Sequence, residues 1–364
     1  MLVFGTRPEA VKMCPLVLEL KKREDLCVRV CVTGQHREML SSVLSFFGVV
    51  PDYDLSVMEE RQTLFDITEK VMRGMRAVLE KERCDLLLVH GDTTTAFAAA
   101  LSAFYMGVSV GHVEAGLRTY DITSPFPEEF NRTAVDSLSA YHFAPTELSA
   151  EQLIAEGKKH ERVFVTGNTV IDALKSTVKV DFSHPALDFA KSKKMVLLTA
   201  HRRENLGAPM TEMFTAIREV LSSHPDVCAV YPVHPNPAVR KAAHAAFDGF
   251  AQVKLIEPLD VFDFHNVMSR AYLVVTDSGG IQEEAPAFGV PVLVMRTTTE
   301  RPEGMLAGTV RLIGNTCESV RTGFAEVLEN GEVYAKMARA RNPYGDGMAC
   351  IRIADIIEKG YTNV

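Results

Sequence analysis

The stretch DLLLVHGDTTTAFAAALSAFYMGVSVGHVEAGLRT (residues 85–119) contains two apolar runs, 85–89 and 108–113, separated by a helix-like segment. Both runs are rich in Val and Leu rather than alternating strictly with polar residues. Strands of this kind, alternating with helices, are typical of parallel sheets that are covered on both faces. The stretch therefore predicts a strand, a helix and a second strand of an α/β protein.

The same alternation of strand-like and helix-like segments continues along the chain. Further strand-like runs lie at 2–4, 28–32, 141–144, 163–167, 195–200, 227–233, 253–256, 272–276, 291–295 and 309–313. A chain of 364 residues is too long for one ordinary core. We therefore expect two Rossmann-like, doubly wound parallel-sheet domains facing a central cleft.

We expect the first domain to span 1–170 and the second to span 171–345. The polar stretch 175–194 suggests a boundary close to this point. The segment 346–364 is expected to form a helix that crosses back to the first domain.

The composition excludes several classes of protein. Apolar residues make up 47% of the chain and charged residues 24%, with a net charge of −8, so the overall basic charge typical of nucleic-acid binding is missing. Seven scattered cysteines without CxxC spacing suggest neither a disulfide framework nor a thiolate metal site. We read no signal peptide and no membrane-spanning run, and expect a cytoplasmic protein without membrane or nucleic-acid partners.

Open α/β sheets bind ligands beyond the carboxyl ends of their strands, and charged residues of the first half follow strand-like runs. Arg7 and Lys12 follow the first run and could reach a phosphate or carboxylate. Asp92 and Glu114 follow the two runs quoted above, and a carboxylate at the end of a buried strand needs a partner. We expect acid–base chemistry here, since paired carboxylates in different environments perform it near neutral pH.

Several of these residues also have a structural interpretation. Thr6 and Glu9 form a capping-box pattern, and Asp92 is placed to cap the following helix. Arg118 is placed to pair with Glu114. In SPFPEEFNR (124–132), Glu128 and Glu129 suit a first helical turn, and Arg132 is spaced to pair with Glu128.

The second half carries groups suited to binding anions. His201, Arg202 and Arg203 follow the run 195–200, which makes an anion site credible. Ser278, Gly279 and Gly280 follow another run and lead into a helix that carries Glu283 and Glu284. Because glycine allows close approach and a helix start offers free N–H groups, this turn suits a nucleotide diphosphate.

Taken together and in order, the motifs resemble those of the non-hydrolysing UDP-N-acetylglucosamine 2-epimerases. The matching segments are FGTRPEAVKM, TGQHREML, HGDTTTAFAAAL, GHVEAGLRT, PFPEEFNR, VTGNTVIDAL, AHRREN, PVHPNP, TDSGGIQEEAPAFGVPVLVMRTTTERPEG and NPYGDGMACIRI. The resemblance implies the glycosyltransferase-B fold, a cytoplasmic homodimer and no metal or nicotinamide cofactor. It also implies interconversion of UDP-GlcNAc and UDP-ManNAc for cell-surface polysaccharides, by elimination of UDP to 2-acetamidoglucal and re-addition.

The resemblance also implies roles for individual residues. The catalytic residues would be Asp92, Glu114, Glu128 and His201; it leaves open which carboxylate is the acid and which the base. The substrate and UDP contacts would be Arg7, Lys12, Arg132, Ser278, Gly279, Gly280 and Glu284. A second, allosteric UDP-GlcNAc site would draw on Gln35, His36, Arg61, Gln62, Arg202 and His234.

Two departures from the family pattern and several alternatives stand beside this interpretation. Glu38 replaces a glutamine of some regulated members, which would weaken an allosteric diphosphate site, and Thr297 stands where aspartate is common. A hydrolysing epimerase would release ManNAc and UDP, a retaining glycosyltransferase would need an acceptor, and a catalytically inactive sensor would only bind UDP-sugar.

Overall fold

The computed structural model describes residues 1–34, 37–59 and 62–362. They divide into two compact units: unit 1 comprises Met1–Ala173 with Tyr344–Val364, and unit 2 comprises Leu174–Pro343. Helix α7 (Thr169–Thr177) runs through the first division point. The units thus divide at 173/174 and 343/344, a few residues from the divisions expected at 170/171 and 345/346, because the chain leaves unit 1 inside a helix rather than in a polar loop.

Unit 1 is built on a parallel sheet, for which the described residues give seven strands in the order β3-β2-β1-β4-β5-β6-β7. Its elements are β1 (Leu2–Phe4), α1 (Arg7–Leu20), β2 (Val30–Val32), α2 (Arg37–Phe47), β3 (Tyr53–Asp54), α3 (Leu64–Leu79), β4 (Leu86–His90), α4 (Thr94–Tyr105), β5 (Ser109–Val113), α5 (Glu128–Leu138), β6 (Tyr141–Ala144), α6 (Glu147–Ala155), a 3-10 turn (His160–Arg162), β7 (Val163–Val165), most of α7, and α16 (Ala349–Thr362). The short strand β3 escaped the sequence pattern because its two residues are not buried.

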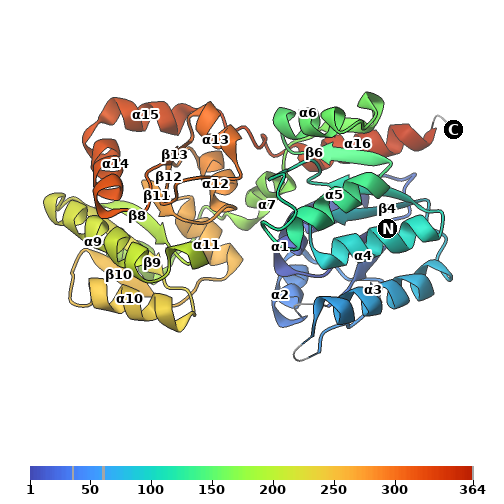
Figure 1. Cartoon of the computed structure of the whole chain (residues 1–364), viewed down its shortest axis with the longest axis horizontal. Helices are drawn as coiled ribbons and strands as arrows, with labels where there is room; N and C mark the ends of the chain where they lie inside the picture. Colours follow the sequence, from blue (N-terminus) through green and yellow to red (C-terminus); the bar gives the residue numbers. More distant parts are fainter. Residues whose placement is uncertain (35–36, 60–61, 363–364) are drawn as a thin grey trace. The chain divides into compact units, whose positions relative to one another are not determined.

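Helices pack on unit 1 in two groups (Figure 1). Helices α3, α4 and α5 lie side by side, while α1 packs between α2 and α16. The capping box predicted for α1 is confirmed: the Thr6 side chain accepts from the Glu9 N–H, and the Glu9 carboxylate accepts from the Thr6 N–H. The last helix begins at Ala349, after a segment containing Pro343, Gly345 and Gly347.

Unit 2 repeats the plan with a parallel sheet, for which the described residues give six strands in the order β10-β9-β8-β11-β12-β13. Its elements are α8 (Pro185–Ala190), β8 (Lys194–Thr199), a 3-10 turn (Arg203–Asn205), α9 (Ala208–Ser223), β9 (Val227–Pro232), α10 (Pro237–Phe247), β10 (Val253–Ile256), α11 (Val261–Met268), β11 (Leu273–Thr276), α12 (Ile281–Glu284), a 3-10 turn (Ala285–Phe288), β12 (Val292–Val294), α13 (Pro302–Ala307), β13 (Val310–Leu312), α14 (Cys317–Glu329) and α15 (Gly331–Arg339).

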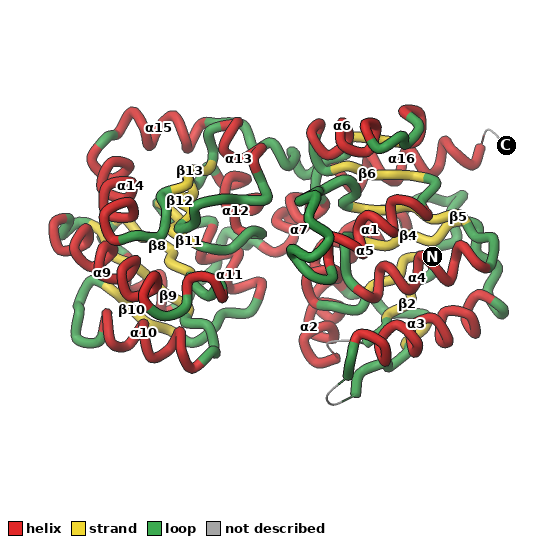
Figure 2. The backbone as a smooth tube through the Cα atoms, in the orientation of Figure 1, coloured by secondary structure: helices red, strands yellow, loops and turns green. Residues whose placement is uncertain are grey.

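The two faces of the second sheet bury different residues of the same strand. Val196 and Leu198 of β8 belong to the core cluster under α9, α10 and α14. Met195 and Leu197 belong to the cluster under α8 and α11. This is why the strand reads as a continuous apolar run: each successive side chain enters one core or the other. Figure 2 shows the helices that accompany the strands of both units.

The predicted fold class is therefore confirmed: each unit is an α/β domain with a doubly wound parallel sheet. The strand order reverses between β1 and β4 in unit 1 and between β8 and β11 in unit 2. Such switch points open a crevice at the carboxyl ends of the strands, where ligands bind. Among the described residues, no helix combines the length and the apolar character needed to cross a bilayer.

Candidate active site

Predicted site residues follow strands that flank the two switch points or, for β5, lie next to such a strand. In unit 1, Arg7 and Lys12 follow β1, Asp92 follows β4 and Glu114 follows β5. In unit 2, His201 follows β8 and Ser278 follows β11. A separate cavity of about 270 Å³ lies at the opposite, amino ends of β1 and β4, lined by Leu2 and Leu86 among others.

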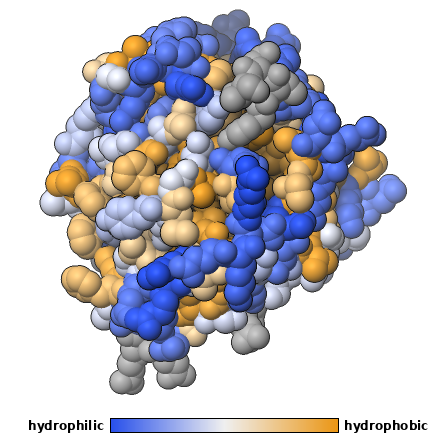
Figure 3. Space-filling model, turned by 90° about the vertical axis from the view of Figure 1, so that its right-hand side faces the viewer, coloured by the Kyte–Doolittle hydropathy of each residue, from blue (hydrophilic) through white to orange (hydrophobic). Residues whose placement is uncertain are grey.

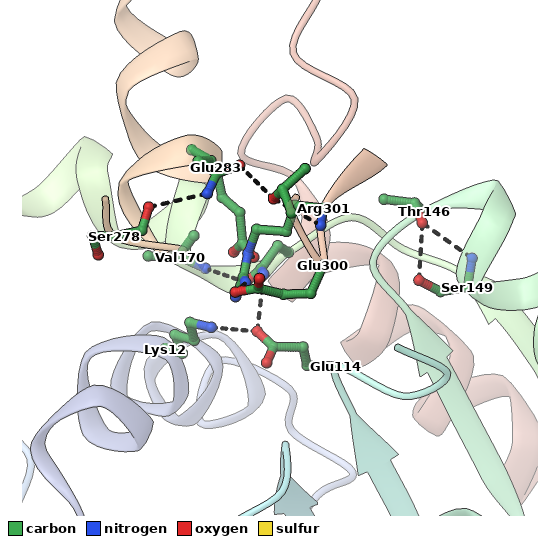
Figure 4. Close-up of polar contacts among 12 residues, drawn as sticks. Lys12, Glu114, Thr146, Ser149, Val170, Ser278, Glu283, Glu300 and Arg301 are labelled. Atoms are coloured by element: carbon green, nitrogen blue, oxygen red, sulfur yellow. Dashed lines mark hydrogen bonds and ion pairs between the residues drawn. The ribbon is translucent and has the colours of Figure 1, made fainter. Parts of the chain in front are cut away.

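Glu114 lies at the centre of the charged cluster in unit 1. Glu114 is 7% exposed, and its backbone φ of 64° is in the left-handed region that a residue with a Cβ rarely adopts. Lys12, on α1, donates to its Oε2, as Figure 4 shows, and Asn168 Nδ2 donates to the same atom at 2.9 Å. His90 Nε2 faces Oε2 at 3.5 Å.

These neighbours keep Glu114 ionised. Burial is the largest single effect and acts to raise the pKa of Glu114, but Lys12, His90 and Arg132 together outweigh it, so the pKa of Glu114 lies well below the ordinary value. The pairing with Arg118 expected from sequence is wrong. Arg118 instead contacts Asp136 and Glu156, each at 2.7 Å, because the fold brings those carboxylates within reach of its guanidinium group.

Arg132 connects the Asp92 carboxylate with the backbone of Glu114. Its Nη1 donates to the backbone carbonyl of Glu114 at 2.7 Å, and its Nη2 donates to the Asp92 carboxylate. Arg132 therefore binds groups of the strand-end loops beside its helix, and not Glu128 as expected from the helical spacing. Asp92 does not cap α4 either: Thr93 is the N-cap, which leaves the Asp92 carboxylate for Arg132.

The two glutamates at the start of α5 have different surroundings. Both lie in the first helical turn, as expected. Glu129 is buried, and its Oε1 accepts from the N–H groups of Thr119 at 3.0 Å and Tyr120 at 2.9 Å. Glu128 is half-buried at the first residue of the helix. Glu129 thus serves to hold the preceding loop, and Glu128 is the better candidate for chemistry.

In unit 2 a buried carboxylate organises the loop that carries His201. Asp277 is 0% exposed and accepts from the backbone N–H groups of His201 and Arg202 at 2.9 Å each. The His201 ring is stacked on that of His234, with centroids 5.2 Å apart. Burial lowers the pKa of His201 below its ordinary value, although the charge of Asp277 acts in the opposite direction. His201 is therefore held near the strand end in a form that is largely neutral at pH 7.

The Ser278–Gly280 turn packs against a cluster of charged side chains. A Cβ placed on Gly279 would lie 2.5 Å from Arg301 Nη1 and 2.7 Å from Glu300 Oε1, so only glycine fits without displacing them. Arg301 also donates to Glu283, which is 1% exposed, and to Glu300 at 2.7 Å (Figure 4). Burial opposes ionisation, but Arg301 and Arg296 bring the pKa of Glu300 down to about 2.

Glu284 contacts a buried histidine. His265 is 2% exposed, and its Nε2 lies 3.5 Å from Glu284 Oε2. Its Nδ1 is 2.9 Å from the Thr177 hydroxyl. Glu284 ends α12, which directly follows the Ser278–Gly280 turn, so the contact with His265 fixes this side chain close to the turn.

The residues expected at an allosteric site are only partly described. Gln35, His36 and Arg61 lie outside the described residues, as does the side chain of Glu38. Gln62 donates to the carbonyl of Val57. Arg202 contacts Glu300 at 3.3 Å, and His234 is exposed.

Sequence reasoning missed four residues of these clusters: Asn168, Asp277, Glu300 and Arg301. Asp277 had a signal, because it follows a buried strand directly, as Glu114 does. The other three come from loops, and no local pattern marks them. Among the described parts of the chain, no group of three or more His, Cys, Asp or Glu side chains is arranged to hold a metal ion.

Known proteins share both the sequence and the fold. The family model of UDP-N-acetylglucosamine 2-epimerase matches residues 18–358. The Bacillus subtilis UDP-N-acetylglucosamine 2-epimerase is 54% identical over 98% of this chain and 93% of its own, and the Escherichia coli K12 enzyme is 48% identical over 98% and 97%.

Solved structures agree. Staphylococcus aureus MnaA in complex with UDP has a TM-score of 0.91 and 50% identity, covering 100% of this chain and 97% of that one. The Neisseria meningitidis UDP-GlcNAc 2-epimerase bound to UDP-GlcNAc has a TM-score of 0.90 and 46% identity, covering 98% and 99%. The chain thus belongs to the UDP-N-acetylglucosamine 2-epimerase family, a family of enzymes.

Proposed function

We propose that this enzyme interconverts UDP-GlcNAc and UDP-ManNAc. The observation that carries the proposal is the position of Arg132, which binds the Asp92 carboxylate and the Glu114 carbonyl together at two neighbouring strand ends. Arg132 thereby fixes the Asp92 carboxylate and the Glu114 backbone beside the switch point of unit 1, so two carboxylates are available there for proton transfer at a sugar carbon. The UDP and UDP-GlcNAc complexes of the relatives support the choice of substrate.

The proposed reaction is an elimination followed by re-addition. A carboxylate of unit 1 takes the C2 proton while the bond from C1 to the diphosphate oxygen breaks, which leaves 2-acetamidoglucal and UDP. A proton then returns to C2 on the opposite face, and UDP attacks C1. Asp92, Glu114 and Glu128 are proposed for the proton transfers, and Arg7, Lys12 and Arg132 for substrate contacts.

Unit 2 is proposed to hold UDP. Ser278, Gly279 and Gly280 would bind the diphosphate, Glu284 the ribose, and His201 would stabilise charge on the departing diphosphate. The absence of a side chain at Gly279 supports this, since a Cβ there would clash with its neighbours and a phosphate needs close approach to the backbone. No metal or nicotinamide enters the proposed reaction, because the elimination needs only proton transfer and charge stabilisation. Regulation by a second UDP-GlcNAc, with Arg202 and His234 among its contacts, is a separate proposal.

Proton NMR in D₂O tests the reaction directly. Incubation with UDP-GlcNAc should produce UDP-ManNAc carrying deuterium at C2. Release of free ManNAc with UDP would identify a hydrolysing enzyme instead. Absence of exchange, with or without extra UDP-GlcNAc as activator, would refute catalysis and leave a UDP-sugar sensor.

We also propose that the enzyme is a cytoplasmic homodimer. Large apolar side chains are exposed on unit 1, among them Phe65 at 88%, Phe104 at 56% and Tyr105 at 69%. Figure 3 shows apolar residues between charged ones on the face of unit 1 that it presents. Exposed apolar side chains favour association with another surface. Light scattering after size-exclusion chromatography tests the state, and a monomer at micromolar concentration would refute it; cell fractionation tests the location.

A further inference from the structure

A buried chain of charged groups lies behind the candidate catalytic carboxylates. His112 on β5 is 0% exposed, and its Nδ1 lies 2.6 Å from Asp136 Oδ1. Its Nε2 lies 2.8 Å from the backbone carbonyl oxygen of Gly91, the residue before Asp92. Neither contact belongs to the groups assigned to substrate above.

The hydrogen-bond chemistry determines the charge of His112. A carbonyl oxygen can only accept, so Nε2 must carry a proton. A carboxylate also accepts, so Nδ1 must carry one too, which makes the ring a cation. A neutral ring would require a proton on Asp136, and the positive charge of Arg118, whose Nη2 lies 2.7 Å from the other oxygen of that carboxylate, disfavours such a proton.

The surrounding charges balance when His112 is a cation. Arg118 binds Asp136 and also Glu156, so His112 and Arg118 face two carboxylates. Burial acts to raise the pKa of Asp136, but His112 and its other donors hold that pKa well below the ordinary value. His142, 2% exposed, adds a longer contact of 3.3 Å to Asp136. Arg132 lies on α5, as Asp136 does, and its positive charge pairs with Asp92.

This series of contacts ends at Gly91, the residue before the candidate catalytic Asp92. Gly91 has a φ of 62°, and its N–H donates to the Val113 carbonyl at 2.9 Å. His112 therefore holds the carbonyl of a residue whose N–H is already held. Asn131 Nδ2 then holds the Asp92 carbonyl at 2.9 Å. With both sides of the turn held, the Asp92 side chain has little freedom to drift.

We propose, on the basis of the function proposed above, that His112 is a positioning residue that donates from both ring nitrogens and fixes Asp92 through the Gly91 carbonyl. Asp136 holds the charge in place. Residues that fix a reacting group matter strongly for rate, since a misplacement of about 1 Å can cost about 100-fold.

The first test reads the charge without substrate. In ¹⁵N NMR of the wild-type enzyme, the His112 ring nitrogens, assigned by comparison with His112→Asn, should both carry a proton, as their contacts with Asp136 and the Gly91 carbonyl require. A neutral tautomer overturns the proposal. This outcome is independent of whether the enzyme acts on UDP-GlcNAc.

The second test compares His112→Asn with His142→Asn. Both variants lose a buried imidazole at Asp136, but only the first loses the contact with Gly91. His112→Asn should lower kcat about 100-fold with KM and UDP affinity changed less than about threefold, whereas His142→Asn should stay within about threefold of wild type. Equal losses would reduce His112 to a structural role, and an inactive wild-type enzyme would refute the proposed function instead.

Discussion

Replacing Arg132 tests whether one side chain holds both the Asp92 carboxylate and the backbone of Glu114. Arg132→Met removes the bond to the buried Glu114 carbonyl, whose unsatisfied oxygen costs about 1–3 kcal/mol. It also removes a charge-assisted bond to Asp92, of about 1.5 kcal/mol because that side chain is 29% exposed and can hydrate. The sum predicts a loss of unfolding free energy of about 2.5–4.5 kcal/mol. Arg132→Lys keeps the charge but cannot span both partners, so we expect about half of that loss.

Urea unfolding followed by circular dichroism measures these differences, with turnover of UDP-GlcNAc recorded in parallel. Arg76→Met is the matched control, because Arg76 forms a fully solvated pair with Glu80, and its unfolding midpoint should not move. Combining Arg132→Met with Asp92→Asn should give a clearly smaller loss than the sum of the two single changes. Additive effects, or a lysine variant as stable and active as wild type, would refute the reasoning.

Three further predictions concern single residues. Glu114→Gln should lower turnover about 10²- to 10⁴-fold while UDP affinity is retained in calorimetry, and unchanged turnover would remove Glu114 from the mechanism. Gly279→Ala should weaken UDP binding about tenfold, because its Cβ displaces Arg301; an unchanged Kd would contradict the proposed diphosphate turn. Asp277→Asn should lower the pKa of His201 further, because burial already lowers it and Asp277 opposes that effect, so a histidine NMR titration should shift to lower pH; a rise would contradict the assignment.

The stability that Glu114 contributes should also depend on pH in one direction. Because its pKa is depressed in the folded protein, this contribution is present above the unfolded pKa and is lost as the pH falls through the folded value. Lys12→Met should reduce it, since Lys12 supplies the largest opposing charge. Unfolding measured between neutral and acidic pH should show a shallower acid loss for the variant, and an unchanged profile would contradict the pairing.

The sequence was sufficient to predict the sheets and the strand ends where charges gather. Continuous apolar strands identify a doubly covered parallel sheet, and the carboxyl ends of its strands are then where binding residues must lie. The partners of those charges could not be predicted in the same way. Arg118 and Arg132 each lie four residues after a glutamate, yet both bind carboxylates brought close by folding. Helical spacing finds neighbours on one helix, whereas Asp92, Glu114 and Asp136 meet only when separate strands and α5 pack together.

Helix α16 has a consequence for the order in which the protein is made. It packs on α1, and Arg23, just after the end of α1, contacts Asp355 at 2.8 Å and Glu358 at 3.2 Å; Ile353 of α16 is fully buried. Unit 2 is therefore an insertion within unit 1, and the ribosome must finish it before unit 1 receives its last helix. During synthesis the nascent first unit keeps the apolar surface of α1 uncovered, while unit 2 already has every one of its strands. A chain released after unit 2 is complete but before α16 is made would thus expose unit 1, and not unit 2, to chaperones and proteases.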